Sequence, residues 1–211
     1  MLLNSFSMGS GGFPQIVTYV GGHESASDLQ TYTFSSVDLK GSGGGNMVVV
    51  CVTGEDNVNA ARTISSLTVA GVSAVKAVSE NQFNNFPSNY SFAAEIWYAN
   101  TSAATGNIVI TWNGVMRTCM ISKYRCGQYK APTQTISNIP QNNPETTNMP
   151  TNGLISIGVA NAKSTHNWSG TMTENRYAVT EQCGMSSGSG PTGTSAIETA
   201  NFIPVIGASW S

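Results

Sequence analysis

The sequence predicts an all-β protein, an antiparallel β-sandwich of about ten strands. Two observations lead to this fold class. Short runs rich in Val, Ile, Thr, Tyr, Phe and Trp are separated by Gly, Asn, Ser and Pro, which is the pattern of strands joined by turns. Hardly any stretch shows the periodicity of an amphipathic helix. A chain of 211 residues is long enough for one domain with a substantial core and short for two.

The expected strands follow from the places where β-branched and aromatic residues dominate. Tight hairpins are expected at Gly71 and at Asn113-Gly114, because Gly and Asn readily take the positive φ of a two-residue turn. In chain order, the expected strands are 15–20, 31–39, 46–53, 67–69 with 74–78, 92–99, 107–112, 117–125, 153–160, 171–179 and 202–210.

Apolar residues alternate within several of these runs, as in strands with one face in a core. In the run 92–99, Glu95 and Trp97 are expected to face away from Phe92, Ala94, Ile96 and Tyr98. The runs 107–112 and 153–160 alternate in the same way. The run 47–52 is apolar on both faces, so we expect it in the middle of a sheet whose outer side is covered.

Three stretches interrupt the strands. Residues 1–13 are interpreted as an N-terminal arm and residues 14–211 as one β-sandwich domain. Four prolines mark 131–152 as a long extended crossover, since proline cannot donate to a strand ladder. Residues 184–195 are rich in Gly and Ser and are expected to form a surface loop, either mobile or held by a partner. No period of roughly 20 to 50 residues repeats, which excludes a solenoid.

Charged residues make up only 9% of the chain, against about 25% in an ordinary globular domain. The formal net charge is -2 and no basic cluster occurs, so a nucleic-acid partner is not expected. No apolar run approaches the roughly 20 residues of a membrane span, and the N-terminus lacks the pattern of a secretory signal. We therefore expect a folded, soluble chain that has no membrane partner and stays where it is made.

The cysteines give no metal-binding pattern. None of their spacings is Cys-x-x-Cys, and none combines with a histidine at zinc-finger distance. A free cysteine in an apolar run is most simply a small buried hydrophobe, and this is the expectation for Cys51. Neither a metal nor another cofactor is expected. The four residues are Cys51, Cys119, Cys126 and Cys183.

Titratable residues gather at few places, and each place has an ordinary structural interpretation. His23 and Glu24, with Asp28 nearby, have the chemistry of an acid/base pair or a cation site. They follow two glycines in an expected loop, however, where charged side chains are normally solvated. His166 lies in an expected turn before a strand, and two histidines alone do not build a His-rich metal site.

Catalytic motifs do not emerge. Gly-x-Ser-x-Gly occurs once, at 184–188, but within the Gly/Ser-rich segment expected to be a surface loop, and no Ser-His-Asp order follows from two loop histidines. A glycosidase would need Glu95 beside another acid such as Glu174 or Glu181, and spacing in a sandwich does not bring them together. The run 41–45 is interpreted as a turn rather than a phosphate loop, because no Lys-Ser/Thr follows and the next element is a strand. We expect no enzyme.

Aromatic side chains are the remaining candidates for recognition. Most are expected in the core, although several on one exposed face would make a sugar-stacking platform. The Asn-rich segment 81–90 suits either glycan hydroxyls or a protein interface, because amides form hydrogen bonds without carrying charge. The candidate interface or glycan contacts are Phe13, Phe83, Asn84, Asn85, Phe86, Tyr90 and Trp168.

The order of several segments carries a resemblance. MVVVCVTGEDN leads through the hairpin LTVAGVSAVKAV to EIWYAN, TGNIVITWNG and CMISKYRCG, and a Pro/Thr-rich stretch precedes GLISIGVANA and FIPVIGASW. This order resembles β-sandwich proteins of tailed bacteriophages and prophages that are components of the tail, fibre or capsid surface. The resemblance implies a virion protein assembled in the bacterial cytoplasm. It carries over no catalytic residue.

The resemblance and the low charge lead to one hypothesis. We expect a single jelly-roll-like sandwich with an N-terminal arm that self-associates as a homo-oligomer, a trimer being the working choice, in a tailed-phage particle. A capsid-decoration or cement subunit is favoured over a tail or fibre subunit, with the major capsid or tail protein as partner and a host surface glycan as a further ligand. The alternative is a carbohydrate-binding β-sandwich module. Deleting residues 1–13 is expected to weaken assembly and to leave the fold intact.

Overall fold

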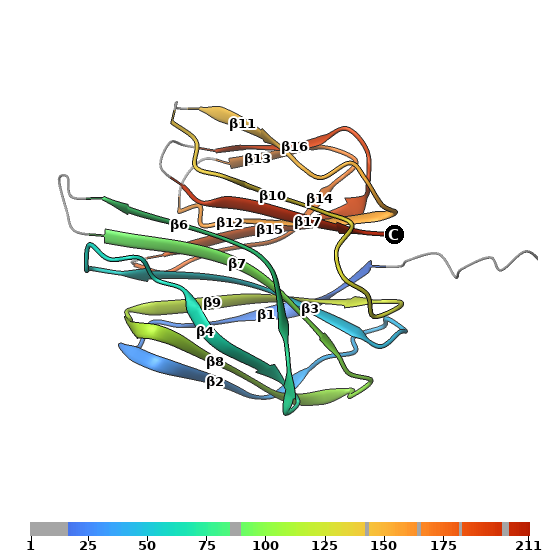
Figure 1. Cartoon of the computed structure of the whole chain (residues 1–211), viewed down its shortest axis with the longest axis horizontal. Helices are drawn as coiled ribbons and strands as arrows, with labels where there is room; N and C mark the ends of the chain where they lie inside the picture. Colours follow the sequence, from blue (N-terminus) through green and yellow to red (C-terminus); the bar gives the residue numbers. More distant parts are fainter. Residues whose placement is uncertain (1–16, 85–89, 142–143, 164–165, 182, 200–202) are drawn as a thin grey trace, which may run out of the picture.

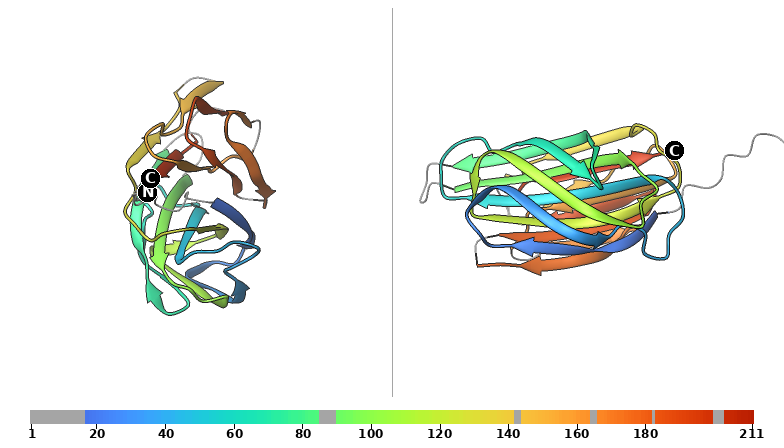
Figure 2. Two further views of the ribbon diagram at one scale, coloured as in Figure 1. Left: turned by 90° about the vertical axis from the view of Figure 1, so that its right-hand side faces the viewer. Right: turned by 90° about the horizontal axis from the view of Figure 1, so that it is seen from below.

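Four antiparallel β-sheets are stacked in this protein, as the edge-on view of Figure 1 shows. The computed structural model describes residues 17–84, 90–141, 144–163, 166–181, 183–199 and 203–211. We number the sheets I to IV along the stack. Sheets I and II form an N-terminal sandwich from residues 17–126, and sheets III and IV form a C-terminal sandwich from residues 134–210. Figure 2 shows the long strands of neighbouring layers lying roughly along one another.

The N-terminal sandwich contains nine strands. Sheet I has the order β2-β8-β4-β5, and sheet II has the order β1-β9-β3-β7-β6. Their bounds are β1 Val17–Ser25, β2 Leu29–Asp38, β3 Met47–Asp56, β4 Ile64–Val69, β5 Val72–Ser73, β6 Val75–Asn84, β7 Tyr90–Asn100, β8 Thr105–Met116 and β9 Thr118–Cys126.

The C-terminal sandwich contains eight strands. Sheet III has the order β10-β17-β12-β15-β14, and sheet IV has the order β11-β16-β13. Their bounds are β10 Gln134–Asn138, β11 Glu145–Asn148, β12 Ile155–Ala160, β13 His166–Gly170, β14 Thr173–Val179, β15 Gly184–Pro191, β16 Ser195–Thr199 and β17 Val205–Trp210.

Each gap between neighbouring sheets is filled by its own apolar cluster. Sheets I and II enclose a cluster that includes Trp112 and Val50. Sheets II and III enclose a second cluster, built from both sandwiches and including Tyr124 and Trp210. Sheets III and IV enclose a third, smaller cluster around Ile197. Sheets II and III are therefore covered on both faces, which requires strands that are apolar throughout or very small on one side.

Strand β3 confirms the expectation for the run 47–52. It lies in the middle of sheet II between β9 and β7, and all ten of its residues are buried. Val48, Val50 and Val52 face sheet I, whereas Met47, Val49 and Cys51 face sheet III. The two-residue period of the strand thus delivers apolar side chains to two different cores.

The alternation expected in other runs is also confirmed. In β7, Ala94, Ile96 and Tyr98 face sheet III, whereas Trp97 faces sheet I. The alternating residues of β8 lie together in the cluster between sheets I and II, and those of β12 lie together between sheets II and III. The hairpin at Gly71 is confirmed too, since Val69 pairs with Val72.

The structure corrects several expected boundaries. Seventeen strands are found among the described residues, not about ten. The expected loop 184–195 is mostly β15, a strand inside sheet III whose first six residues are buried. The expected crossover 131–152 contains β10 and β11. The turn expected at Asn113-Gly114 is absent, since β8 continues through both residues to Met116. The Arg62 side chain lies over Gly114 there.

The correction at β15 has a physical cause. Strand β15 has a Gly/Ser composition that ordinarily disfavours a strand, and its neighbours leave room for little else. The Trp168 ring lies against Gly188, and backbone atoms of Thr171 lie against Gly190. Close approach of neighbouring elements therefore selects small residues in a buried strand.

The C-terminal sandwich repeats the strand order of the N-terminal one. We number strands one to eight within each half and count β5 together with β6 as the fifth. Sheets II and III then share the order 1-8-3-6-5, sheet I has the order 2-7-4-5 and sheet IV has 2-7-4. Six antiparallel pairings recur in both halves, and among the described residues only the pairing of strands four and five lacks a counterpart.

Two glycines support the correspondence between the halves. Gly45 precedes β3 and Gly153 precedes β12 by the same interval, and φ is 106° and 123°, respectively. A side chain at Gly45 would collide with the carbonyl oxygen of Cys126 at the end of β9. A side chain at Gly153 would lie 2.7 Å from the carbonyl oxygen of Trp210 at the end of β17. Glycine is required at both positions for the same reason.

The two sandwiches contact each other reciprocally. Strand β3 contacts β12, and both are the third strand of their half. The sixth strand of each half contacts the eighth strand of the other, as β7 does with β17 and β15 with β9. In the same way, the fifth strand of each half contacts the first strand of the other, as β6 does with β10 and β14 with β1. This is the contact pattern of subunits related by a two-fold axis.

Candidate functional site

The predicted contact residues fall on two separate parts of the fold. Phe13, Asn85 and Phe86 lie outside the described residues. Phe83 and Asn84 end β6, and Tyr90 begins β7, so these three share one hairpin of sheet II. Trp168 lies in β13 of sheet IV, in the other sandwich.

The aromatic residues of the β6–β7 hairpin do not form one platform. Phe83 pairs with Ser91 while Tyr90 pairs with Asn84, so the two rings lie on opposite faces of the sheet. Phe83 is 48% exposed and Tyr90 is 37% exposed. The Tyr90 ring lies 6.1 Å from that of Phe92, which shares its face.

Trp168 has a structural position. Its ring lies over Gly158 of β12 and Gly188 of β15, in the gap between sheets III and IV. Its indole Nε1 donates a hydrogen bond to Ser186 Oγ at 2.7 Å. The ring fills a space that the two glycines leave, so Trp168 is not part of a surface shared with Phe83 and Tyr90.

A polar and aromatic cluster lies beside Trp168, at the side where β13 and β14 are both edge strands. His166 Nε2 lies 2.6 Å from Glu174 Oε1, which also accepts a hydrogen bond from Ser186 Oγ at 2.7 Å. The His166 and Tyr177 ring centroids are 4.5 Å apart. Tyr177 is 47% exposed, so an aromatic face is presented next to a carboxylate. The sequence marked His166 and Glu174 separately, but nothing in it indicated that they meet.

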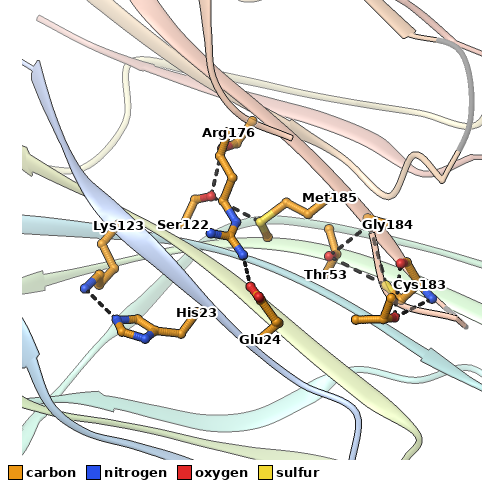
Figure 3. Close-up of polar contacts among 11 residues, drawn as sticks. His23, Glu24, Thr53, Ser122, Lys123, Arg176, Cys183, Gly184 and Met185 are labelled. Atoms are coloured by element: carbon orange, nitrogen blue, oxygen red, sulfur yellow. Dashed lines mark hydrogen bonds and ion pairs between the residues drawn. The ribbon is translucent and has the colours of Figure 1, made fainter. Parts of the chain in front are cut away.

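His23 and Glu24 lie in strand β1 rather than in the expected loop. Their side chains point to opposite sides of sheet II. His23 Nε2 lies 3.1 Å from Lys123 Nζ, and burial, together with the charge of Lys123, lowers the pKa of His23. Glu24 accepts a hydrogen bond from Arg176 of β14, which ties the two sandwiches together (Figure 3). The acid/base pair considered from the sequence is therefore divided between two structural contacts.

Hydroxyl groups join the two sandwiches inside the gap between sheets II and III. Tyr124 OH donates to Ser187 Oγ at 2.9 Å, and Ser187 Oγ donates to Ser122 Oγ at 2.8 Å. Ser122 Oγ in turn donates to Met185 Sδ at 3.1 Å (Figure 3). The chain of hydrogen bonds is buried and crosses a largely apolar interface, so it helps to fix how the sandwiches are aligned.

A second set of polar contacts crosses the same gap. Thr53 Oγ1 donates to the carbonyl oxygen of Gly184 at 3.2 Å (Figure 3). Asn161 Nδ2 donates to the carbonyl oxygens of Gly54 and Ala93 at 3.0 and 3.3 Å, and Cys183 Sγ donates to Asn161 Oδ1 at 3.4 Å. The four cysteines are free and buried, and burial raises the pKa of the Cys183 thiol to about 11. Cys51 is fully buried, as expected.

Glu95 is held by structural contacts. Its carboxylate accepts hydrogen bonds from the Ile64 N–H at 2.8 Å and Trp97 Nε1 at 2.8 Å, and Lys76 Nζ lies at 3.0 Å. Glu174 belongs to the other sandwich. Glu181 follows β14 in that same sandwich, so neither candidate partner lies in the N-terminal sandwich with Glu95. Among the residues that the structure describes, no group of three His, Cys, Asp or Glu side chains is placed to hold a metal ion.

The sheet edges are poor in basic side chains. Four sheets have eight edge strands, and within the described chain only β6 and β14 contain Lys or Arg. Lys76 of β6 contacts the buried Glu95, and Arg176 of β14 contacts Glu24. Both cations are therefore engaged within the molecule instead of guarding an edge, whereas protein edges are ordinarily protected from pairing by charged residues, above all lysine.

No protein-family model, no curated protein and no solved structure matches this chain. Nor does any helix among the described residues have the length and apolar character needed to cross a membrane. Two of the features described above bear on function: the sheet edges that are poor in basic side chains, which we call the weakly protected sheet edges, and the His166–Glu174–Tyr177 cluster.

Proposed function

We propose that this protein is a non-enzymatic structural subunit of a tailed-bacteriophage particle that self-associates. The weakly protected sheet edges carry the proposal. Edge strands such as β6 and β11 carry acidic residues but, within the described chain, no Lys or Arg that is not already engaged, and a neighbouring copy that covers the edges adds protection from pairing. The low content of charged residues also supports self-association, because contacts between subunits are depleted in charged residues. The proposal includes a trimer, assembly in the bacterial cytoplasm and a position as a capsid-decoration subunit in preference to a tail or fibre subunit.

We further infer a jelly roll in each half of the chain. A jelly roll has eight strands in two sheets, linked as two Greek keys, and occurs in viral capsid and lectin domains. The orders 1-8-3-6 and 2-7-4-5 in facing sheets support this assignment for the N-terminal sandwich. The orders 1-8-3-6 and 2-7-4 support it for the C-terminal sandwich. The chain then holds two such units in place of the single one expected from the sequence.

The oligomeric state tests the proposal. Size-exclusion chromatography with light scattering is expected to give a multiple of the 22.1 kDa chain mass, threefold for the trimer. Binding to empty phage capsids, measured by co-sedimentation, tests the location. A chain that stays monomeric at all concentrations and does not bind capsids contradicts the proposal.

An edge variant shows which surface is responsible. Strand β10 is an uncharged edge, and Thr135 and Ser137 on it are exposed. The double variant Thr135→Lys and Ser137→Lys is expected to weaken self-association, because two added charges oppose strand pairing. The matched control adds the same charges at exposed Ser102 and Ala104, in the loop between β7 and β8, and is expected to associate normally.

A carbohydrate-binding module is the second candidate, favoured by the His166–Glu174–Tyr177 cluster. An exposed aromatic ring beside a carboxylate fits a sugar, because the ring packs on the apolar face and the carboxylate accepts from hydroxyls. Retention of the monomer on a bacterial surface polysaccharide, lost in Tyr177→Ala but kept in Tyr90→Ala, would support this function over the structural one.

A further inference from the structure

Two cations are buried side by side in the N-terminal sandwich. Lys123 and Arg125 are alternate residues of β9, so they project from the same face of sheet II, toward sheet I. Each is only 2% exposed. Such burial is rare for Lys and Arg unless an anionic group compensates them.

Arg125 has no such group within the described chain. Its Nε and Nη1 atoms are buried and have no hydrogen-bond partner there, and no carboxylate forms an ion pair with it. The residues outside the description contain no Asp or Glu, as their sequence shows, so no acidic side chain among them supplies the missing charge. The chain therefore supplies no paired carboxylate for Arg125, and an anion from outside it would provide the missing counter-charge.

Lys123 adds to the positive potential. Its Nζ contacts neutral groups, donating to the carbonyl oxygen of Asp38 at 2.8 Å and lying 3.1 Å from His23 Nε2. The Asp38 carboxylate is the acid whose charge acts on Lys123, and its Oδ1 accepts from the N–H groups of Lys40 and Gly41. Burial lowers the pKa of both Lys123 and Arg125, which reflects the incomplete compensation.

A glycine-rich segment, residues 40–46, lies against Arg125; we call it the glycine loop. Gly43 is buried, and a Cβ there would lie 3.0 Å from Thr18 Oγ1 and 3.1 Å from Arg125 Cβ. Within the described chain, the N–H groups of Ser42, Gly44 and Gly45 have no acceptor. The Gly43 N–H donates to the carbonyl oxygen of Lys40 instead, whereas Ser42, Gly44 and Gly45 are exposed. Neighbouring backbone N–H groups in a turn, such as those of Gly44 and Gly45, can form a concave site for anions.

We infer that Arg125 and the glycine loop bind a small tetrahedral oxyanion of the phosphate or sulfate class. The planar guanidinium matches two oxygens of such an ion, and the loop N–H groups are suited to the others. A small ion fits better than a partner's side chain, because Arg125 lies beneath its own chain. The sequence favours a plain turn for this loop, because no Lys-Ser/Thr follows and the next element is a strand; in the fold, the cation beside the loop is Arg125 of β9. This inference does not depend on the proposed virion function.

Calorimetry and thermal unfolding of the full chain test the inference, with inorganic phosphate as the probe and chloride at matched ionic strength as the reference. We expect saturable phosphate binding. At a concentration tenfold above the Kd, the midpoint temperature should rise by about 3–6 °C, since a ligand bound only to the folded state stabilises it by mass action. Sulfate should compete.

The variant Arg125→Met locates the site. Methionine fills a similar volume without charge, so the variant is expected to fold at least as stably as the wild type in chloride. Its affinity for phosphate should fall by about tenfold or more. The control Lys130→Met removes an exposed cation and should leave binding unchanged.

Three results would overturn the inference. The first is the absence of saturable phosphate binding by the wild-type chain, which would refute the inference without measurements on a variant. The second is an equal rise in midpoint temperature with chloride and phosphate, which would be a general salt effect. The third is unaltered phosphate binding by Arg125→Met. If wild type does not bind phosphate and Arg125→Met dissociates an oligomer, a carboxylate of a second copy is the partner instead.

Discussion

Glu55 should make the stability of this protein fall as the pH rises from about 4.5 to 7. The residue lies near the end of β3 and is 1% exposed. Its Oε1 is 3.6 Å from Arg117 Nη1, and its Oε2 is buried without a partner within the described chain. Burial raises the pKa of Glu55 from 4.5 to about 7, and the charges of Arg117 and Lys163 oppose this rise only in part.

The sign and size follow from proton linkage. Between pH 4.5 and 7 the folded state holds the Glu55 proton and the unfolded state has released it, so the stabilising contribution is complete below 4.5 and is lost through this window. The difference between the two pKa values corresponds to about 3 kcal/mol as an upper value, at about 1.4 kcal/mol per pH unit. Glu55→Gln cannot ionise and removes this dependence.

Urea unfolding followed by tryptophan fluorescence from pH 4 to 8 measures the effect. We expect the free energy of unfolding of the wild type, relative to Glu55→Gln, to decline by up to about 3 kcal/mol across this range. The exposed-residue control Glu181→Gln should follow the wild-type curve. Parallel curves for wild type and Glu55→Gln would refute the reasoning, because the carboxyl group would then be ionised at neutral pH in both states.

Three further predictions concern close contacts and thiols. Gly153→Ala should lower the free energy of unfolding by about 1–3 kcal/mol in a denaturant titration, because it combines a positive φ with a collision at the Trp210 carbonyl. Gly158→Ala should lower it by about 1–3 kcal/mol and change the fluorescence of Trp168, since the new Cβ would lie 2.8 Å from that ring; an unchanged spectrum would contradict this. Ellman's reagent should titrate none of the four thiols in the native protein and all four in denaturant, because each is buried and burial raises its pKa; rapid native labelling would count against the fold.

The candidate contact residues show which properties local sequence patterns predict and which they do not. Phe83 and Tyr90 are exposed on the hairpin where the sequence places them, but the pairing register of β6 and β7 puts their rings on opposite faces. The Asn-rich composition does not encode that register. Trp168 is held inside the C-terminal sandwich because glycines on two other strands make room for it. The first outcome is set by the geometry of the hairpin, and the second by glycines on strands β12 and β15.

The sequence alone determined the all-β class, the alternation of most strands and the double-sided burial of β3, because a period of two residues is a local property of the chain. Only the tertiary structure decided that two sandwiches of the same strand order stack face to face, that the Gly/Ser segment 184–191 is a buried strand, and that Arg125 lies beneath the glycine loop. Each of these depends on which surfaces meet across long stretches of chain, and the space and charge at such contacts are set by residues distant in sequence.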